Sequence, residues 1–195
     1  MHIDAQGKIL IAPPGMPDPR FRKTVVFIWK HDVSGAAGVV INKRCKRPTF
    51  KHVCQEGNIH LKKDISPPVY YGGPVLNNVV GVLHSTEYRL PSTNCLNDST
   101  VGFTLDSKIL VDVAEGRGPL NTMVTLGMCN WNASQLEEEI EHPHAPGMSW
   151  LMVDYDEKLV FGQTEDYKAD EMWEDCLSKA VKNKTAEITS RIFKD

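Results

Sequence analysis

The sequence predicts an α+β fold: a single compact domain in which a large mixed β-sheet is flanked by short helices. Two observations carry this prediction. Short β-branched and aromatic runs of strand length recur along the chain, and turn residues separate them. Between several of these runs lie short segments with apolar residues at helical spacing. The 195 residues, 41% of them hydrophobic, suffice for one large domain, which we place at residues 1–182. Residues 183–195 are expected to form a tail that either extends the last helix or frays.

The first half of the chain is expected to contain five strands and one helix. The strands cover residues 8–12, 24–30, 38–42, 69–71 and 79–84. Turn residues between the second and third strands predict an antiparallel hairpin. Phe50, Val53 and Cys54 have the i, i+3, i+4 spacing of a short amphipathic helix, which ends at Gly57. Four prolines stiffen residues 10–21 between the first two strands, and we interpret this segment as a scaffold.

The second half is expected to add four strands and three helices. The strands cover residues 101–105, 121–126, 150–154 and 159–161, the last two as a terminal hairpin. One helix follows Asp106, one begins at Ser134 and one covers residues 170–181. Ser134 and Glu137 match the capping box, in which each side chain satisfies a free amide of the other residue. Pro143 is expected to end that helix.

Composition points to an intracellular protein with free thiols. No apolar run approaches the ~20 residues of a membrane span. The N-terminus lacks the features of a signal peptide, so a cytoplasmic location is expected. The five scattered cysteines are odd in number, which favours free thiols over disulfides. Their spacing fits no zinc site, and the sequence predicts neither a metal nor a cofactor.

One basic cluster stands out from an uneven charge distribution. Residues 1–63 carry a net charge of +8 and residues 64–195 carry −11. The cluster consists of Lys43, Arg44, Lys46, Arg47 and Lys51. It could contact phosphates. No nucleic-acid recognition motif accompanies it and the pI is about 6.2, so a solvated turn and helix start is the favoured interpretation.

Three residues offer a catalytic alternative. His31 and His84 each end a predicted strand, and Cys129 follows another one. No serine stands in a GxSxG elbow, and no third group completes a catalytic set with either histidine. Cys129 and Trp131 lie just before the helix at Ser134, which makes them candidate binding residues. Trp131 is expected to be buried and to anchor the turn there.

Taken together, five stretches resemble the AlgH/YqgE family, also called the UPF0301 or DUF179 proteins. They read LIAPPGMPDPRFRKTVVFIWKH, GAAGVVINK, VYYGGPV, GVLHS and TLGMCNWNASQLEEEI. The resemblance implies a compact α+β domain from a bacterium or a phage, located in the cytoplasm. Some members are labelled transcriptional regulators, and the family supplies no catalytic residues to carry over. This chain departs from the family pattern at Arg44, at residues 129–132, which read CNWN, and in the tail.

The leading hypothesis is a non-enzymatic regulatory or protein-binding domain that acts through an unidentified protein partner. Two alternatives stay open. One is an enzyme that uses polar groups near His31, His84 and Cys129. The other is a nucleic-acid-binding regulator that uses the basic cluster, although we expect nucleic acid not to be the partner. The sequence does not indicate an oligomeric state.

Overall fold

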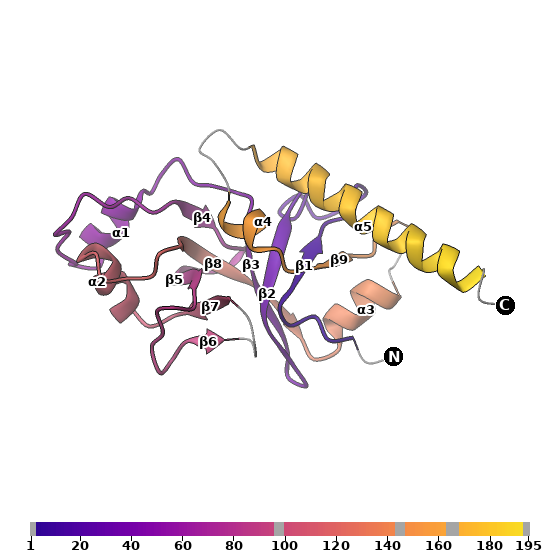
Figure 1. Ribbon diagram of the computed structural model, residues 1–195, viewed down its shortest axis with the longest axis horizontal. Helices are drawn as coiled ribbons and strands as arrows, with labels where there is room; N and C mark the ends of the chain where they lie inside the picture. The colour runs from indigo at the N-terminus through magenta and orange to yellow at the C-terminus, as the bar shows by residue number, and fades with distance from the viewer. Residues whose placement is uncertain (1–2, 96–99, 143–146, 163–167, 193–195) are drawn as a thin grey trace.

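A computed structural model describes residues 3–95, 100–142, 147–162 and 168–192 (Figure 1). The strands are β1 (Lys8–Ile11), β2 (Val25–Asp32), β3 (Gly35–Val40), β4 (Val69–Tyr71), β5 (Val75–Ser85), β6 (Asn94–Cys95), β7 (Val101–Thr104), β8 (Thr122–Asn132) and β9 (Leu151–Asp154). The helices are α1 (Phe50–Glu56), α2 (Lys108–Ala114), α3 (Gln135–Glu141), α4 (Glu157–Phe161) and α5 (Ala169–Ile192). The predicted α+β class is confirmed. None of the helices in these ranges is long and apolar enough to cross a membrane.

The strands form one mixed sheet. Eight strands follow the order β6-β7-β5-β8-β3-β2-β1-β9 with antiparallel pairing, and β4 pairs with β8 in parallel. The sheet curls, so that β2 approaches β6 from the other end of the strand order. Trp29 of β2 and Phe103 of β7 stack across this gap, with ring centroids 4.8 Å apart. This aromatic contact therefore connects two strands, β2 and β7, that are not hydrogen-bonded neighbours in the sheet.

The helices cover the sheet in three places, each over its own apolar cluster. The first half of α5 packs against β1, β2 and β9, and buries Met172, Trp173 and Cys176 (Figure 1). Helix α3 packs on β3 and β8 and buries Leu136. Helices α1 and α2 share a third cluster with residues of β4, β5 and β8, which includes Phe50. Helices α3 and α5 therefore belong to different clusters from α1 and α2.

The proline-rich connection and the glycine pair both act as scaffold. The segment between β1 and β2 is held by backbone bonds and by the indole of Trp173, which donates to the carbonyl of Ala12 at 2.8 Å. Gly72 and Gly73 follow β4 and cross closely over β8. A Cβ at Gly72 would lie 2.3 Å from the carbonyl oxygen of Gly127, and one at Gly73 would lie 2.2 Å from the carbonyl carbon of Met128. Only residues without a side chain allow this approach.

The largest correction concerns the segment around Trp131. Strand β8 was expected to end at residue 126, but it continues to Asn132. The register pairs Trp131 with Ala36 and Asn130 with Ala37, so the small residues of β3 accommodate it. Cys129 and Trp131 therefore lie within a strand and not in a turn.

Two further expectations about local structure are wrong. Ser134 precedes α3 in a left-handed conformation with φ of 61°, and its side chain makes no capping bond. Glu137 contacts His31 through Oε1. The stretch expected as a strand at 159–161 belongs to α4. Asp156 caps that helix and accepts hydrogen bonds from the amides of Lys158 and Leu159. Pro143, expected to end α3, lies outside the described residues.

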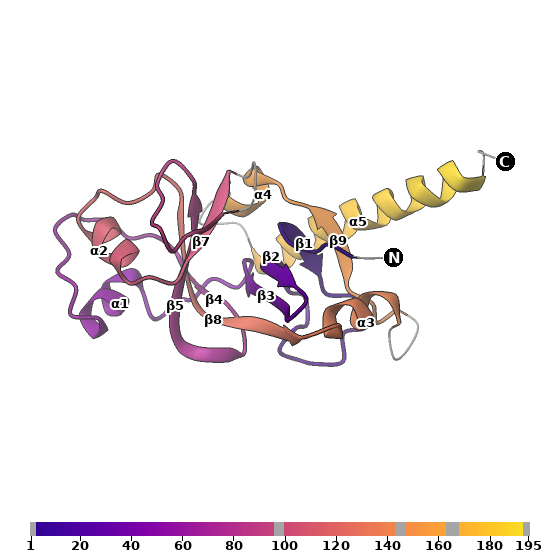
Figure 2. The same ribbon diagram turned by 90° about the horizontal axis from the view of Figure 1, so that it is seen from below.

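The tail was expected either to extend the last helix or to fray. It extends the helix, since α5 continues through Ile192 without a break. Figure 2 shows the last turns of α5 leaving the body of the molecule. We call residues 181–192 the α5 extension.

Candidate functional site

The basic cluster lies on the segment that joins β3 to α1, and its five residues differ in role. The ammonium of Lys43 donates to the carbonyl of Arg20 at 2.9 Å, and burial lowers the pKa of Lys43. Arg44 faces Tyr70 in an isolated antiparallel bridge beside β4. Lys46, Arg47 and Lys51 are exposed. Because Lys43 is committed to the scaffold, the cluster presents fewer free charges than the sequence suggests.

Cys129 is buried in the middle of β8 and is 1% exposed. Its Sγ donates to the carbonyl of Gly72 at 3.6 Å. Burial raises the pKa of Cys129 to about 12, against a weaker opposing effect of Lys43. The thiol is therefore protonated at neutral pH, and the thiolate is the form that acts as a nucleophile. The position fits a core residue.

Trp131 is buried, and its ring is part of a polar clamp on α3. Its indole N–H donates to Oε2 of Glu139 at 3.0 Å, and the indole of Trp150 donates to the same oxygen at 2.8 Å. The amide of Gln135 donates to the other carboxylate oxygen at 2.8 Å. The two indoles meet edge to face with centroids 6.0 Å apart. One carboxylate thus joins β8, α3 and the residue before β9.

His31 near the end of β2 uses both ring nitrogens. Nδ1 accepts the amide of Ala5 at 3.1 Å, so Nε2 carries the proton and donates to Oε1 of Glu137 at 3.1 Å. Its side chain is only 3% exposed. His31 therefore ties the N-terminal segment to α3 through both ring nitrogens.

His84 lies in β5, away from His31, and is part of a continuous hydrogen-bond chain. The amide of Leu90 donates to the Thr93 hydroxyl at 2.9 Å, and the two hydroxyls of Thr93 and Thr104 are 2.7 Å apart. The Thr104 hydroxyl reaches Nε2 of His84 at 2.8 Å, while Nδ1 lies 2.9 Å from the carbonyl of Ser85. Burial is the main cause of a lowered pKa at His84. In the neutral imidazole that burial favours, Nδ1–H donates to the carbonyl of Ser85 and Nε2 accepts the Thr104 hydroxyl.

The structure does not bring His31, His84 and Cys129 together. His31 contacts α3, His84 contacts β7, and Cys129 packs on the crossing after β4. Each is buried and hydrogen-bonded within the protein. In the part of the chain that the structure describes, no group of three His, Cys, Asp or Glu side chains could hold a metal ion.

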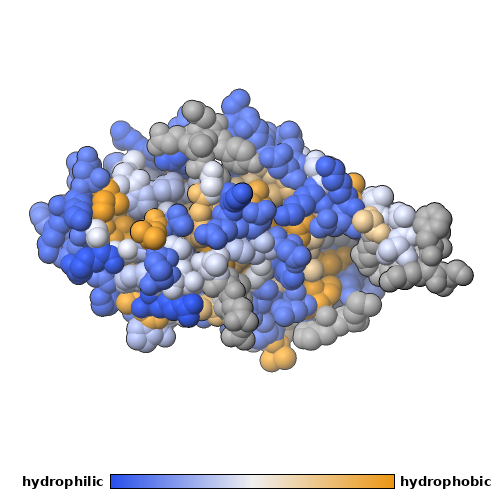
Figure 3. Space-filling view, in the orientation of Figure 1, coloured by the Kyte–Doolittle hydropathy of each residue, from blue (hydrophilic) through white to orange (hydrophobic). Residues whose placement is uncertain are grey.

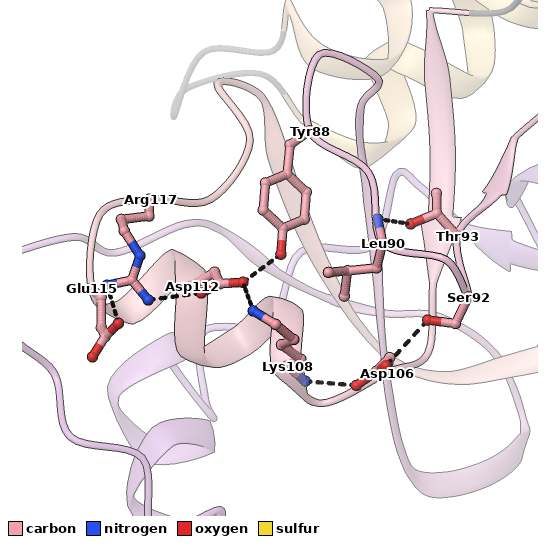
Figure 4. A network of polar contacts seen from close by, with 9 residues as sticks. All are labelled: Tyr88, Leu90, Ser92, Thr93, Asp106, Lys108, Asp112, Glu115 and Arg117. Carbon is pink, nitrogen blue, oxygen red and sulfur yellow. Dashed lines mark hydrogen bonds and ion pairs between the residues drawn. The ribbon is translucent and has the colours of Figure 1, made fainter.

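A second polar network surrounds Asp112 on α2, and the sequence reasoning missed it (Figure 4). One carboxylate oxygen accepts the Tyr88 hydroxyl and the Lys108 ammonium, both at 2.6 Å. The other accepts Arg117 at 2.9 Å. Burial raises the pKa of Asp112, but these three bonds outweigh it and the pKa is lowered. Arg117 also pairs with Glu115. The network fixes the loop after β5 to α2.

The clearest hollow in the described surface has a volume of about 560 Å³. It lies between the segment 65–68, the connection from α2 to β8, and α4. Pro68, Leu120, Asn121, Met123 and Phe161 are among its lining residues. This volume is within the ~300–1,000 Å³ range of small-molecule sites. None of the sequence-predicted site residues is among the lining residues.

Comparison with known proteins decides the family. The family model described as AlgH-like (DUF179) matches residues 9–184. The chain belongs to the AlgH-like family. A UPF0301 protein from Jannaschia sp. is 37% identical over 174 residues, which cover 88% of this chain and 85% of the relative. A UPF0301 protein from Burkholderia cenocepacia is 39% identical over 181 residues, which cover 90% and 88%. The resemblance inferred from the sequence is confirmed.

The AlgH-like fold is also seen in solved structures. The solution structure of the AlgH protein from Pseudomonas aeruginosa matches with a TM-score of 0.69 and 28% identity, and 93% of each chain is covered. A crystal structure from Corynebacterium diphtheriae matches with a TM-score of 0.68 at 18% identity, over 91% of this chain and 88% of the other. The AlgH-like match ends at residue 184, so most of the α5 extension lies beyond it.

Two features of this chain were not predicted from the sequence: the Glu139 clamp and the Asp112 network. Lys108 and Asp112 have the i, i+4 spacing of a helical ion pair, so this contact could have been predicted from the sequence. The partners Tyr88 and Trp150 come from other elements, and no local pattern indicates them.

Proposed function

We propose that this AlgH-like protein is a non-enzymatic regulatory domain that binds a protein partner through the α5 extension. One observation carries the proposal: α5 has 24 residues, but Ala180 is the last buried residue among the α5 side chains that the structure describes. Ala180 is 5% exposed and the next residue, Val181, is 52% exposed. Figure 2 shows this part of the helix projecting from the body with no other element beside it.

The length of the extension favours a docked role. At 1.5 Å per residue, its twelve residues span about 18 Å. Because the extension continues α5, it needs no separate helix nucleation and presents a preformed helix to a partner. Helix-in-groove binding reads apolar side chains spaced along one helix face.

The face that follows Val181 is less polar than its composition suggests. The hydroxyl of Thr185 donates to the carbonyl of Val181, and that of Thr189 donates to the carbonyl of Thr185, both at 2.9 Å. Because these hydroxyls are satisfied inside the helix, the threonine methyl groups remain for contact. Ala186 adds a further methyl group at an exposed position.

The lysines beside this helix face determine which charge a complementary partner would carry. Lys182 and Lys184 are exposed, and neither forms an ion pair with any residue that the structure describes. A complementary partner would present an apolar groove bordered by carboxylates. The buried, internally paired states of His31, His84 and Cys129 support binding over catalysis. The regulatory part rests on the labels of some family members.

The test is a paired capture experiment with the full chain carrying a photo-crosslinking residue at Ala186. The wild type is compared with a variant that combines Lys182→Glu, Lys184→Glu and Thr185→Glu. Lys63→Glu is the matched control, because it reverses one exposed charge on the body of the protein. Crosslinked proteins from the natural host are identified by mass spectrometry.

We expect one protein with an acidic-bordered groove to be crosslinked by the wild type and by the control. The triple variant should reduce its yield at least about fivefold, the effect of ~1 kcal/mol of binding free energy. Equal capture by the triple variant would overturn the proposal, and so would the absence of any wild-type crosslink.

A further inference from the structure

The hollow between α2, α4 and the segment 65–68 has the construction of a ligand site. Its lining mixes polar and apolar residues, and two of the apolar ones, Met123 and Val160, are almost fully buried, with exposures of only 2% and 1%. Pro68 and Phe161 contribute rigid, flat surfaces to the lining. This part of the site favours a planar or branched apolar group.

Leu120 extends the apolar lining to the surface. It belongs to the lining and is 86% exposed, although leucine gains from burial. Its backbone is fixed, since the Leu120 amide donates to Oε1 of Glu87 at 2.6 Å. Figure 3 shows isolated hydrophobic side chains among hydrophilic ones on this face, over the segment between α2 and β8. A bound molecule would cover Leu120.

Polar groups line the same hollow. Ser66 and Asn121 both contribute to it. Within the described ranges, neither the Ser66 hydroxyl nor the Asn121 carboxamide has a hydrogen-bond partner. The Asn121 backbone is nevertheless held, because its carbonyl accepts the amide of Ser85 at 3.1 Å. These side chains are positioned by the fold and available to a ligand.

The charge at the edge of the hollow is positive. The stem and ammonium of Lys63 lie 2.5–2.9 Å from the position that a Cβ on Gly116 would occupy, and Gly116 is a lining residue. Gly116 has φ of 73°, so the turn requires glycine and the missing side chain leaves room for Lys63.

The nearby carboxylates do not cancel this charge. Glu115 is paired with both Lys62 and Arg117. Asp64 is exposed beside Lys63 and is the carboxylate that competes with a ligand there. Asp64 is not among the lining residues, whereas the three atoms nearest to a Cβ on Gly116 all belong to Lys63.

We propose that this hollow binds a small amphipathic carboxylate, with its flat apolar body between Pro68, Phe161 and Leu120. The carboxylate lies toward Lys63, where charge and the free hydrogen-bonding groups of Ser66 and Asn121 complement it. This site is separate from the α5 extension and does not depend on the proposed protein partner.

The test uses two probes that share a ring system and differ in charge. Indole-3-acetate carries a carboxylate and tryptamine carries an ammonium. Each is titrated to about 5 mM into the full-length protein with ¹³C-labelled Leu, Val and Met methyl groups, a range that detects dissociation constants near 1 mM. We expect saturable shifts at Leu120, Met123 and Val160 with indole-3-acetate, and at least fivefold weaker binding of tryptamine.

Variants separate the charge from the apolar surface. Lys63→Glu should weaken indole-3-acetate about three- to tenfold and strengthen tryptamine, while Leu120→Ser should weaken both. Lys182→Glu is the matched control on α5 and should change neither. Unchanged methyl spectra elsewhere show that each variant is folded.

Three results would overturn the proposal: no saturable shift with either probe, equal affinity for both probes, or shifts confined to methyl groups outside the hollow. Lys63→Glu is a test variant in the titration and the control in the crosslinking experiment. Lys182→Glu is the control in the titration and is part of the triple variant in the crosslinking experiment. Failure at the hollow therefore leaves the partner proposal standing, and failure at the α5 extension leaves the ligand proposal standing.

Discussion

The carboxylate of Glu139 accepts the indole N–H of Trp131 at 3.0 Å, and this bond connects the end of β8 to the helix that follows it. The connection is part of a buried cluster on the α3 side of the sheet. Because both residues take part in the packing of this region, we expect substitutions at either one to lower the free energy of unfolding.

Trp131→Ala should lower the free energy of unfolding by about 3–5 kcal/mol, because it removes a buried aromatic ring and leaves a cavity. Urea denaturation followed by far-UV circular dichroism measures this. Ser134→Ala is the comparison at the neighbouring position. It should change stability by less than about 0.5 kcal/mol, since Ser134 makes no capping bond. A neutral Trp131→Ala would contradict the core assignment.

Glu139→Ala should cost about 1–3 kcal/mol for each indole N–H that loses its only acceptor. Glu138→Ala is the matched control, because Glu138 lies on the same helix and is exposed. The same urea titrations apply to both variants. If Glu138→Ala costs as much as Glu139→Ala, the effect belongs to the helix and not to the clamp.

His84 should make stability depend on pH below about 6.5, its usual pKa. Burial lowers the folded-state pKa, so the unfolded state binds more protons as the pH falls. The contribution is complete above the unfolded-state pKa and is lost as the pH falls toward the folded-state pKa, by at most about 1.4 kcal/mol per pH unit. Unfolding free energies of wild type and His84→Gln, measured between pH 7.5 and 5.5, should show a smaller slope for the variant. Parallel slopes would exclude His84 as the source.

The five cysteines should react with N-ethylmaleimide in an order set by burial. Cys45 and Cys95 are partly exposed, whereas Cys54, Cys129 and Cys176 are buried. The thiolate is the reactive form, and burial raises the pKa of Cys129 and of Cys176 to about 12. Peptide mapping should find Cys129 labelled only after unfolding in denaturant. Early labelling of Cys129 in the native protein would show that the crossing over β8 opens readily.

The protein should bind DNA no more tightly than about 10⁻⁶ M at physiological salt, the tight limit of typical non-specific binding. Lys43 is committed to the Arg20 carbonyl, and the chain carries a net charge of −3. Fluorescence anisotropy with random and genomic duplexes measures the affinity. Submicromolar, sequence-selective binding would instead favour a nucleic-acid-binding regulator.

Much of the fold could be read from the sequence where local pattern and tertiary context agree. Residues 25–29 are β-branched or aromatic, and they lie in the central strand β2 of the sheet. Phe50, Val53 and Cys54 form the buried face of α1, which ends before Gly57 as expected. In both places the residues that prefer a conformation also bury the apolar surface that it creates.

The misses occur where a distant partner decides the local structure. Asn130 and Asn132 are typical turn residues, yet pairing with β3 keeps them in a strand. Ser134 and Glu137 have capping-box spacing, but His31 offers Glu137 a partner from another element. The hollow lined by Leu120 depends on three separated segments, and nothing local indicates that they meet.

The position of β8 in the chain shapes how the protein is made. This strand pairs with β3, β4 and β5, yet all three leave the ribosome before it. Until residue 132 has been synthesised, the growing chain carries apolar strands whose edges have no neighbour, and such edges favour association with other chains. The strands β1–β3 therefore cannot join β5 and β7 in one sheet until β8 has been synthesised. About two thirds of the chain must be made before this central part of the sheet can form.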